Sequence, residues 1–390
     1  MILPPATLGL LGGGQLGRFF VSAAHELGYR VVVLDPDPDS PAGRIADQHL
    51  AAAYDDPAAL DHMAATCAAI STEFENVPAG SLAWLARSLP VRPGAEAVSI
   101  CQNRCAEKAF LRRFGLPLAP YAEIRCAEDV QLADADLFPG ILKVARFGYD
   151  GKGQVVVDNR AQAREAFVRF GFEPCVLEKK LELERELSVV LARDENGEVR
   201  CFAAAENLHR RGILDVSFVP HARAGEAAAA ERLAVELAQR MDYVGVLAVE
   251  FFVVGKRIYI NEMAPRPHNS GHYTLDACAT SQFEQQVRAL CGLPLGDPRR
   301  HSAAVMVNLL GDLWYGDGEE AAREPDWRKL LAVPNLKLHL YGKPDARPGR
   351  KMGHFTVLGS EAATAVETAL AVHQSIGSGG ETRLARAESR

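Results

Sequence analysis

Two apolar segments, VGVLAVEFFVV and RIYINEM, stand on either side of Gly255-Lys256. Apolar runs separated by a short Gly-containing turn are typical of a β-hairpin. With a three-residue loop at 255–257, Glu250 and Glu262 would face each other on the same side of the hairpin. A two-residue loop would place them on opposite faces. Few other features of the chain constrain its fold and its chemistry so closely.

Opposed carboxylates in apolar strands need a partner. Directly opposed side chains have Cβ atoms about 4.5–5.5 Å apart, and two negative charges there repel by a few kcal/mol at an effective dielectric of about 20. A divalent cation removes this repulsion, and oxygen ligands favour Mg²⁺ or Mn²⁺. We therefore predict Glu250 and Glu262 as metal ligands, with Asn261 assisting and nucleotide phosphates completing the shell. A structural ion pair is the alternative.

A glycine-rich stretch, KVARFGYDGKGQ, occupies residues 143–154 after the apolar strand GILKV. Its glycines let backbone N–H groups approach an anion, and Lys143, Arg146 and Lys152 supply a positive field. We interpret it as a mobile lid over a nucleotide triphosphate. An ordinary hairpin with YDGKG as its turn is the alternative.

The N-terminal segment has the pattern of a βαβ unit. The strand TLGLL leads into G-x-G-x-x-G at Gly12, Gly14 and Gly17, then a helix, and RVVVLD closes with Asp35. This pattern predicts a phosphate-binding turn and, alone, would suggest NAD. The motif is weak in isolation, because other βαβ domains that bind phosphorylated ligands use the same glycines.

Polar side chains follow the third predicted strand, AAIST, in the segment EFENVP. Glu73, Glu75 and Asn76 would lie at the carboxyl end of a parallel strand, where α/β sheets place ligand contacts. Capping of the next helix is the alternative. After a VRPG junction, a helix from Asn103 would place Arg104 and Lys108 on one face.

The loop APRPHNSGHYTLDAC after the hairpin is dense in polar groups. Arg266 offers a fork for a carboxylate, bicarbonate or phosphate. Directional hydrogen bonds to a substrate are predicted for His268, Asn269, Ser270 and His272. Neutral structural histidines are the alternative.

Composition excludes several classes of function. The net charge of −7 gives no general attraction to nucleic acid or to an anionic membrane. No apolar run approaches the roughly 20 residues of a membrane span, and we expect no signal peptide. The eight cysteines are scattered, without C-x-x-C pairs, so we expect free thiols in a reducing cytoplasm.

The motifs together are more specific than any one of them alone. GGGQLG, EFENVP, GYDGKGQ, NLHRRGIL, VGVLAVEFF, INEMAPRPHNSGH and RPGRKMGH stand in this order from Leu8 to about His354. In this set the chain resembles the N5-carboxyaminoimidazole ribonucleotide synthases, ATP-grasp ligases of purine biosynthesis. The resemblance implies an α/β (α+β) ATP-grasp fold, with an N-terminal Rossmann-like pre-ATP-grasp domain and a small C-terminal domain. The expected limits are 1–93, 94–300 with a lid lobe at about 117–182, and 301–376, followed by a disordered tail at 377–390.

The resemblance also implies a reaction. ATP and bicarbonate would give carboxyphosphate, which would carboxylate the exocyclic amine of 5-aminoimidazole ribonucleotide with release of ADP and phosphate. A homodimer, Mg²⁺ and ATP are expected with it, and neither nucleic acid nor membrane is an expected partner. The alternatives are a formate- or glycine-using ATP-grasp ligase, a non-catalytic nucleotide sensor and an NAD-dependent dehydrogenase.

Site residues are implied by position in the matching motifs. For ATP they are Arg104, Lys108, Lys143, Gly148, Tyr149, Asp150, Gly151, Lys152, Gly153, Gln154, Glu178, Lys179, Lys180, Leu181, Glu186, His209, Asn261 and Glu262. For the ribonucleotide they are Gln15, Glu73, Tyr149, Asp150, Lys152, Asn269, Arg350 and Lys351, to which the residue patterns above add Asn76, Arg266, His268, Ser270 and His272. The catalytic set is Asp150, which would take the amine proton or orient the amine, Lys152, which would hold the carboxylate, Tyr149 and Lys351.

Overall fold

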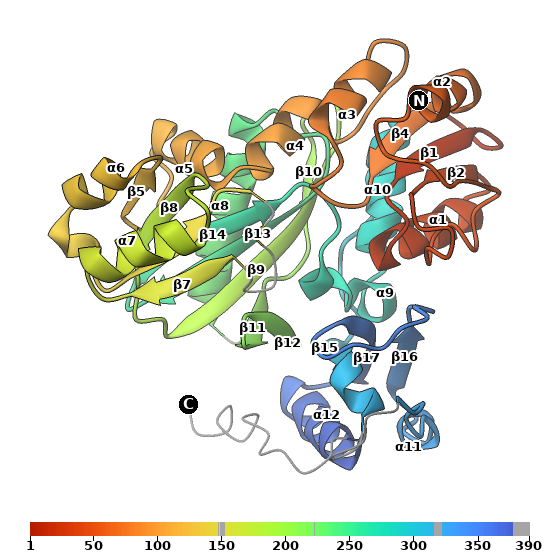
Figure 1. Ribbon diagram of the computed structural model, residues 1–390. Helices are drawn as coiled ribbons and strands as arrows, with labels where there is room; N and C mark the ends of the chain where they lie inside the picture. Colours follow the sequence, from red (N-terminus) through yellow and green to blue (C-terminus); the bar gives the residue numbers. More distant parts are fainter. Residues whose placement is uncertain (147, 149–152, 222, 316–321, 377–390) are drawn as a thin grey trace.

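The computed structural model describes residues 1–146, 148, 153–221, 223–315 and 322–376. The predicted tail at 377–390 lies outside them. Three β-sheets organise this part of the chain (Figure 1). No helix in the described ranges is long and apolar enough to cross a bilayer. All eight cysteines are free thiols, as predicted.

The N-terminal sheet is parallel, with strand order β3-β2-β1-β4. Its elements are β1 (Thr7–Leu11), α1 (Gln15–Glu26), β2 (Arg30–Leu34), β3 (Gln48–Leu50), α2 (Pro57–Thr66), β4 (Ala69–Thr72) and α3 (Ala79–Leu85). The predicted βαβ unit is confirmed. A late helix, α10 (Gln282–Cys291), packs on α1, where Phe283 joins Phe20 in one core. The hydrophobic core beside this sheet therefore includes a helix that lies about 200 residues downstream in sequence.

The second sheet is antiparallel, with order β5-β8-β6-β7, and falls within the predicted lid lobe. Its elements are β5 (Tyr121–Ile124), α6 (Ala127–Leu132), the 3₁₀ helix η1 (Ala135–Leu137), β6 (Gly140–Val144), β7 (Gln154–Val157), α7 (Arg160–Arg169) and β8 (Cys175–Lys179). Ahead of it come α4 (Ala95–Cys101) and α5 (Arg104–Arg113). The helix predicted from Asn103 is confirmed, and the Asn103 side chain caps it. Strands β6 and β7 form the hairpin that carries the glycine-rich stretch.

The third sheet is antiparallel and runs β14-β13-β9-β11-β12-β15-β17-β16, with β10 beside β9. Its strands are β9 (Arg185–Arg193), β10 (Val199–Cys201), β11 (Ala205–Arg210), β12 (Ile213–Val219), β13 (Gly245–Val254), β14 (Arg257–Ala264), β15 (Ala303–Leu310), β16 (Leu336–Leu340) and β17 (Lys351–Gly359). The associated helices are α8 (Ala224–Arg240), η2 (Asn269–Gly271), α9 (Thr274–Ala277), η3 (Gly311–Trp314), α11 (Arg328–Leu331) and α12 (Ala362–Ile376). Because β15 pairs with β12, the predicted C-terminal domain shares a continuous sheet with the central one. The domain limits themselves stay a prediction.

Three stacked histidines lie where these parts meet. His354 lies between His272 and His339, with ring centroids 4.6 Å apart on each side. Phe19 from α1 packs against all three rings. Asp276, His339 and His354 bring potential metal-ligand atoms within 4.8 Å of one another. Nitrogen lone pairs lie in the ring plane, and the planes of His339 and His354 are only 21° apart, so their lone pairs do not converge on one ion.

Burial lowers the pKa of His272 and of His354 well below the ordinary histidine value. The neighbouring His339 lowers both pKa values further, and Lys351 and Arg266 also lower the pKa of His272. Asp276 forms a hydrogen bond with His339, the outer ring of the stack. Both imidazoles are therefore neutral in the folded chain but bind protons in the unfolded chain below about pH 6.5. Their contribution to stability is present above that pH and is lost as the pH falls.

We therefore expect the free energy of unfolding to decrease on acidification below about pH 6.5, by up to about 1.4 kcal/mol per pH unit for each of the two groups. Denaturant titrations across this range measure the slope. His354→Phe keeps a ring in the stack and is expected to remove one group's share of it. His301→Gln, at an exposed site, is the control and should leave the slope intact. An unchanged slope in His354→Phe would contradict this account.

Candidate active site

The hairpin of β13 and β14 pairs Glu250 directly with Glu262, as predicted. The predicted three-residue loop is wrong, because Val254 pairs with Arg257 and leaves a two-residue turn. The register is restored by a β-bulge, since Phe251 pairs with Ile260 and Asn261 is the extra residue. A bulge shifts a strand by one residue and so returns the second glutamate to the face of the first.

The two carboxylates have different surroundings. Burial and then the neighbouring Glu262 raise the pKa of Glu250 to about 7. Burial alone would raise the pKa of Glu262 too, but Arg104 and Lys143 outweigh it and hold that pKa below its usual value. Arg104 Nη1 lies 3.1 Å from Glu262 Oε2, and His268 Nε2 lies 3.2 Å from Glu250 Oε1. Arg104 and Lys143 thus hold Glu262 as a carboxylate, whereas the second negative charge, on Glu250, is disfavoured.

The residues present fit a divalent cation. Beside the two carboxylates, the side-chain oxygen Oδ1 of Asn261 is buried and lacks a hydrogen-bond partner among the described residues. Its backbone oxygen accepts from Lys108 Nζ at 2.7 Å. An oxygen-only donor set of this kind suits Mg²⁺ or Mn²⁺.

A buried cluster of opposite charge lies beside this pair. Glu178 Oε2 is 2.9 Å from Lys143 Nζ, and its Oε1 is 3.3 Å from Lys108 Nζ. Against its own burial, Lys108 and then Lys143 hold the pKa of Glu178 down at about 2. The predicted lysines therefore converge, and Glu178 contributes its side chain to them. The backbone N–H groups of Lys179 and Lys180 donate to Pro120 and Pro139.

The glycine-rich hairpin reaches the same place. Arg104 Nη2 donates to the backbone oxygen of Gly148 at 3.2 Å, so one guanidinium joins α5, Glu262 and the hairpin. Gly153 has a φ of +70°, and its oxygen accepts from the Val144 N–H at 2.8 Å. Gln154 is exposed at the start of β7. The predicted contacts Tyr149, Asp150, Gly151 and Lys152 lie outside the described residues.

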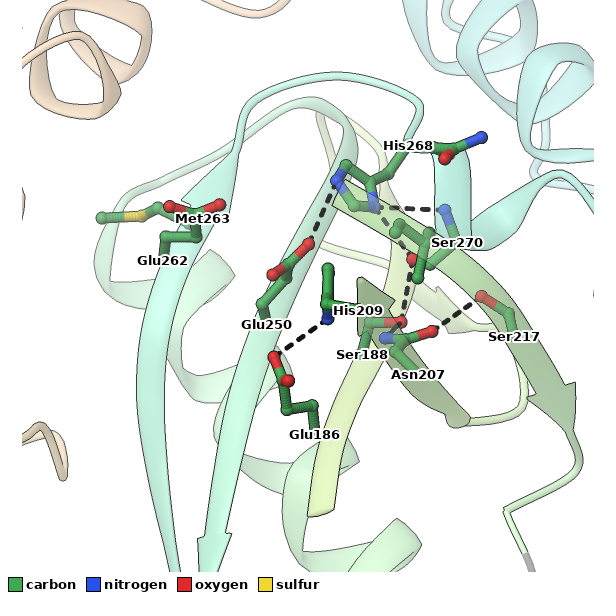
Figure 2. A network of polar contacts seen from close by, with 12 residues as sticks. Glu186, Ser188, Asn207, His209, Ser217, Glu250, Glu262, Met263, His268 and Ser270 are labelled. Atoms are coloured by element: carbon green, nitrogen blue, oxygen red, sulfur yellow. Dashed lines mark hydrogen bonds and ion pairs between the residues drawn. The ribbon is translucent and has the colours of Figure 1, made fainter. Parts of the chain in front are cut away.

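Glu186 and His209 form a second polar pair beside Glu250 (Figure 2). His209 Nδ1 lies 3.0 Å from Glu186 Oε2. Burial alone would lower the pKa of His209, but Glu186 and then Glu250 raise it to about 9. A cationic imidazole therefore faces the carboxylate pair, as suits a group predicted to bind ATP. Leu181, partly exposed beyond β8, stays a prediction for ATP.

Two predicted substrate contacts in the polar loop after β14, Arg266 and His272, contact other parts of the protein instead. Arg266 is engaged by Glu75, with Nε–Oε2 at 2.5 Å and Nη2–Oε1 at 3.3 Å. This bidentate pair fastens the loop to the end of β4, so the fork is not open to an anion in this structure. His272 is fully buried in the histidine stack, which corrects its prediction as a substrate contact. The alternative interpretation, a neutral structural histidine, applies to His272.

Asn269 and Ser270 are also buried. Asn269 exchanges two amide hydrogen bonds with Asn308, at 3.0 and 2.6 Å. Ser270 Oγ lies 2.8 Å from His268 Nδ1. Both residues thus shape the loop, and any substrate contact by them stays a prediction.

The glycine turn of the N-terminal unit is filled by carboxylates. Glu73 accepts from the backbone N–H groups of Gly14 at 2.5 Å and Leu16 at 3.1 Å. Asp35 accepts from Gly13 N–H at 2.6 Å. These are the donors that a dinucleotide pyrophosphate would need. The turn is therefore not arranged for NAD. Gln15 and Asn76, both partly exposed, remain predictions for the ribonucleotide.

The late basic segment lies at the start of β17. Arg350 Nη1 donates to the backbone oxygen of Asp345 at 2.7 Å, and Asp37 from the N-terminal unit acts electrostatically on it. Lys351 is close enough to act on the pKa values of Glu250 and His268. The structure thus brings Lys351, 89 residues after Glu262 in sequence, towards the carboxylate pair.

Glu107 is a residue that the sequence patterns missed. Its buried carboxylate accepts from Met263 N–H at 2.7 Å. Strand β14 is at the sheet edge, where such N–H groups have no strand partner, so Glu107 fixes the backbone beside Glu262. Burial and then Glu262 raise its pKa to about 7, with Lys108 opposing. The only available signal was an acidic residue between Arg104 and Lys108 on a predicted helix.

Comparisons with known proteins cover nearly the whole chain. Family models match at residues 5–102 (ribonucleotide synthetase preATP-grasp domain), 109–283 (ATP-grasp domain) and 304–368 (phosphoribosylaminoimidazole carboxylase C-terminal domain). An N5-carboxyaminoimidazole ribonucleotide synthase of Brucella melitensis is 46% identical over 361 residues, which are 90% of this chain and 96% of that protein. The chain belongs to the N5-carboxyaminoimidazole ribonucleotide synthase family.

Solved structures of N5-carboxyaminoimidazole ribonucleotide synthases agree. The Staphylococcus aureus enzyme complexed with ADP has 36% identity and a TM-score of 0.87, with 95% of this chain and 98% of that chain covered. The Aspergillus clavatus enzyme in complex with ADP and 5-aminoimidazole ribonucleotide has 30% identity and a TM-score of 0.86, with 95% and 98% covered. The predicted ATP-grasp fold, enzyme class and family are thereby confirmed, and the dehydrogenase and sensor alternatives are set aside.

Proposed function

We propose that this chain uses ATP and bicarbonate to carboxylate the exocyclic amine of 5-aminoimidazole ribonucleotide, with release of ADP and phosphate. The observation that carries the proposal is the opposed pair Glu250 and Glu262, set among Arg104, Lys143 and His209. Relatives bound to ADP and to the ribonucleotide support the choice of substrates.

The charges of the site suit the first half-reaction. Bicarbonate and the γ-phosphate are both anionic, so positioning and charge neutralisation lower the barrier. Lys143, Arg104 and the cationic His209 would hold phosphate oxygens. Glu250, Glu262 and Asn261 would hold Mg²⁺ or Mn²⁺, which when bound adds positive charge at the β- and γ-phosphates.

The second half-reaction needs protection from water, because carboxyphosphate hydrolyses readily. We assign this to the β6–β7 hairpin, whose tip would close over the site. Asp150 would take the amine proton or orient the amine, and Lys152 would hold the carboxylate. Tyr149 and Lys351 would contact the ribonucleotide. Arg350 would bind its phosphate.

The test is acceptor-dependent release of ADP. Purified protein with Mg²⁺-ATP is given 5-aminoimidazole ribonucleotide, glycine with an amine-bearing sugar phosphate, or formate with a formate-accepting ribonucleotide, each with and without bicarbonate. The proposal expects full stimulation by 5-aminoimidazole ribonucleotide alone among the acceptors, and a carboxylated product only when bicarbonate is present. Stimulation by glycine or by formate would contradict the proposal and would assign the chain as another ATP-grasp ligase. We further propose a cytoplasmic homodimer, which sedimentation of the purified chain checks.

A further inference from the structure

A line of buried polar side chains runs from the carboxylate pair into the central sheet (Figure 2). It links Ser217 of β12, Asn207 of β11 and Ser188 of β9 to Ser270 and His268 of the loop. The four relay residues Ser188, Asn207, Ser217 and Ser270 are each 2% exposed or less. Burying this many hydroxyl and amide groups is costly unless every one is hydrogen-bonded.

The direction of every hydrogen bond in this line follows from one end. The backbone N–H of Ser270 can only donate, and it points at His268 Nδ1 at 3.3 Å. Nδ1 therefore carries no proton, and the proton of the neutral ring is on Nε2, which faces Glu250 Oε1 at 3.2 Å. Ser270 Oγ, 2.8 Å from Nδ1, must then donate its hydrogen to that nitrogen.

The same logic continues inward. Because the Ser270 hydroxyl hydrogen is used, Ser188 must donate to Ser270 Oγ, at 2.8 Å. Ser188 then needs a donor, which is the Asn207 amide nitrogen at 2.9 Å. This orientation leaves Asn207 Oδ1 facing Ser217, which donates at 2.7 Å. All hydrogens along the line point towards His268, and the amide orientation of Asn207 is determined by the network.

We propose that Ser188, Asn207 and Ser217 are positioning residues that hold His268 as the Nε2–H tautomer and, through that N–H, orient Glu250 towards the metal. Ser188 lies directly opposite Glu250 in the pairing of β9 with β13, whereas Asn207 and Ser217 act from one and two strands further away. The proposal rests on the proposed metal role of Glu250. It extends the site into β11 and β12, strands to which the sequence motifs assigned only His209.

Asn207→Asp tests the direction of the relay with almost no change of shape. At alkaline pH the introduced carboxylate only accepts, so Ser188 must turn its hydrogen towards it. Ser270 then loses its donor and turns its own hydrogen to Ser188. The histidine proton is then expected to move to Nδ1 at the expense of the Ser270 N–H contact, which at 3.3 Å is the longest in the line, and this leaves the Nε2 lone pair facing Glu250. Nitrogen-15 labelling of histidine reports the tautomer by long-range NMR couplings in metal-free protein, with His268→Gln identifying the signal.

We expect the Nε2–H tautomer in the parent chain, its loss in Asn207→Asp, and about a tenfold rise in the Mg²⁺ concentration that gives half-maximal activity. At saturating Mg²⁺, kcat and the KM for ATP should stay within about threefold. Asn159→Asp is the matched control, because aspartate caps α7 as well as asparagine does. Ser188→Ala should raise the Mg²⁺ requirement less, and Ser188→Thr, which keeps the hydroxyl, should restore it.

The outcomes separate the relay from the proposed function. A parent chain with no requirement for a divalent cation overturns the metal role on which the relay rests. A Mg²⁺-dependent parent chain, with the same tautomer and the same Mg²⁺ requirement in Asn207→Asp, overturns the relay alone. If Asn207→Asp does not fold, the Ser188→Ala and Ser188→Thr pair decides: equal Mg²⁺ requirements in both would contradict the proposal.

Discussion

Glu262→Gln is expected to lower kcat/KM for ATP by about 10²- to 10³-fold, or roughly 3–4 kcal/mol of transition-state stabilisation. The glutamine keeps the shape of the side chain but removes one of the two opposed negative charges. It also leaves the Arg104 guanidinium, now 3.1 Å from a carboxylate oxygen, without its ionic partner. Phosphate release at increasing Mg²⁺ and Mn²⁺ measures the effect, and higher metal concentrations should recover part of the loss.

The control for this variant is Glu236→Gln, a surface position on α8 whose exposed pair with Arg240 contributes little. It should match the parent chain in rate and in thermal stability. A Glu262→Gln enzyme with the parental rate and the parental metal requirement would rule out Glu262 as a metal ligand. A changed rate with an unchanged metal requirement would instead assign Glu262 to holding Arg104.

Asp150→Asn is expected to abolish carboxylation of the ribonucleotide, with a loss of at least about 10²-fold, while ATP affinity stays within a few fold. The asparagine cannot accept the amine proton, whereas the other groups assigned to ATP remain in place. Phosphate release stimulated by 5-aminoimidazole ribonucleotide reports the first quantity, and ADP and ATP titrations by calorimetry report the second.

Asp158→Asn is the matched substitution, at an exposed position directly after β7 of the same hairpin. It should have parental activity. Full activity in Asp150→Asn would end the assignment of Asp150. A large loss of ATP affinity in the same variant would move Asp150 from the ribonucleotide to the nucleotide.

Much of the fold could be predicted because it depends on local patterns. The apolar runs and the helix from Asn103 depend on signals within a few residues, and the structure has the expected elements there. The pairing of Glu250 with Glu262 was correct for an incomplete reason. The turn has two residues, and the bulge at Asn261 that compensates has no sequence signature at a non-glycine residue.

The parts of the site that could not be predicted depend on contacts between distant segments. Arg266 and Glu75 are 191 residues apart, so the loop pattern alone gave no sign that the fork was already engaged. His272 is buried because α1, α10 and β17 supply Phe19, Phe283 and His354 around it. The glycine turn likewise predicts an anion-binding site, and in the structure the Glu73 carboxylate, a side chain of the same protein, occupies it.

The most direct test of the central claim uses bicarbonate labelled with oxygen-18. If ATP phosphorylates bicarbonate, the bridging oxygen of carboxyphosphate comes from bicarbonate and leaves with the phosphate when the amine attacks the carboxyl carbon. We predict one oxygen-18 atom in the phosphate released with each carboxylated ribonucleotide, as read by mass spectrometry. Carboxylated product accompanied by phosphate without the label would contradict the account.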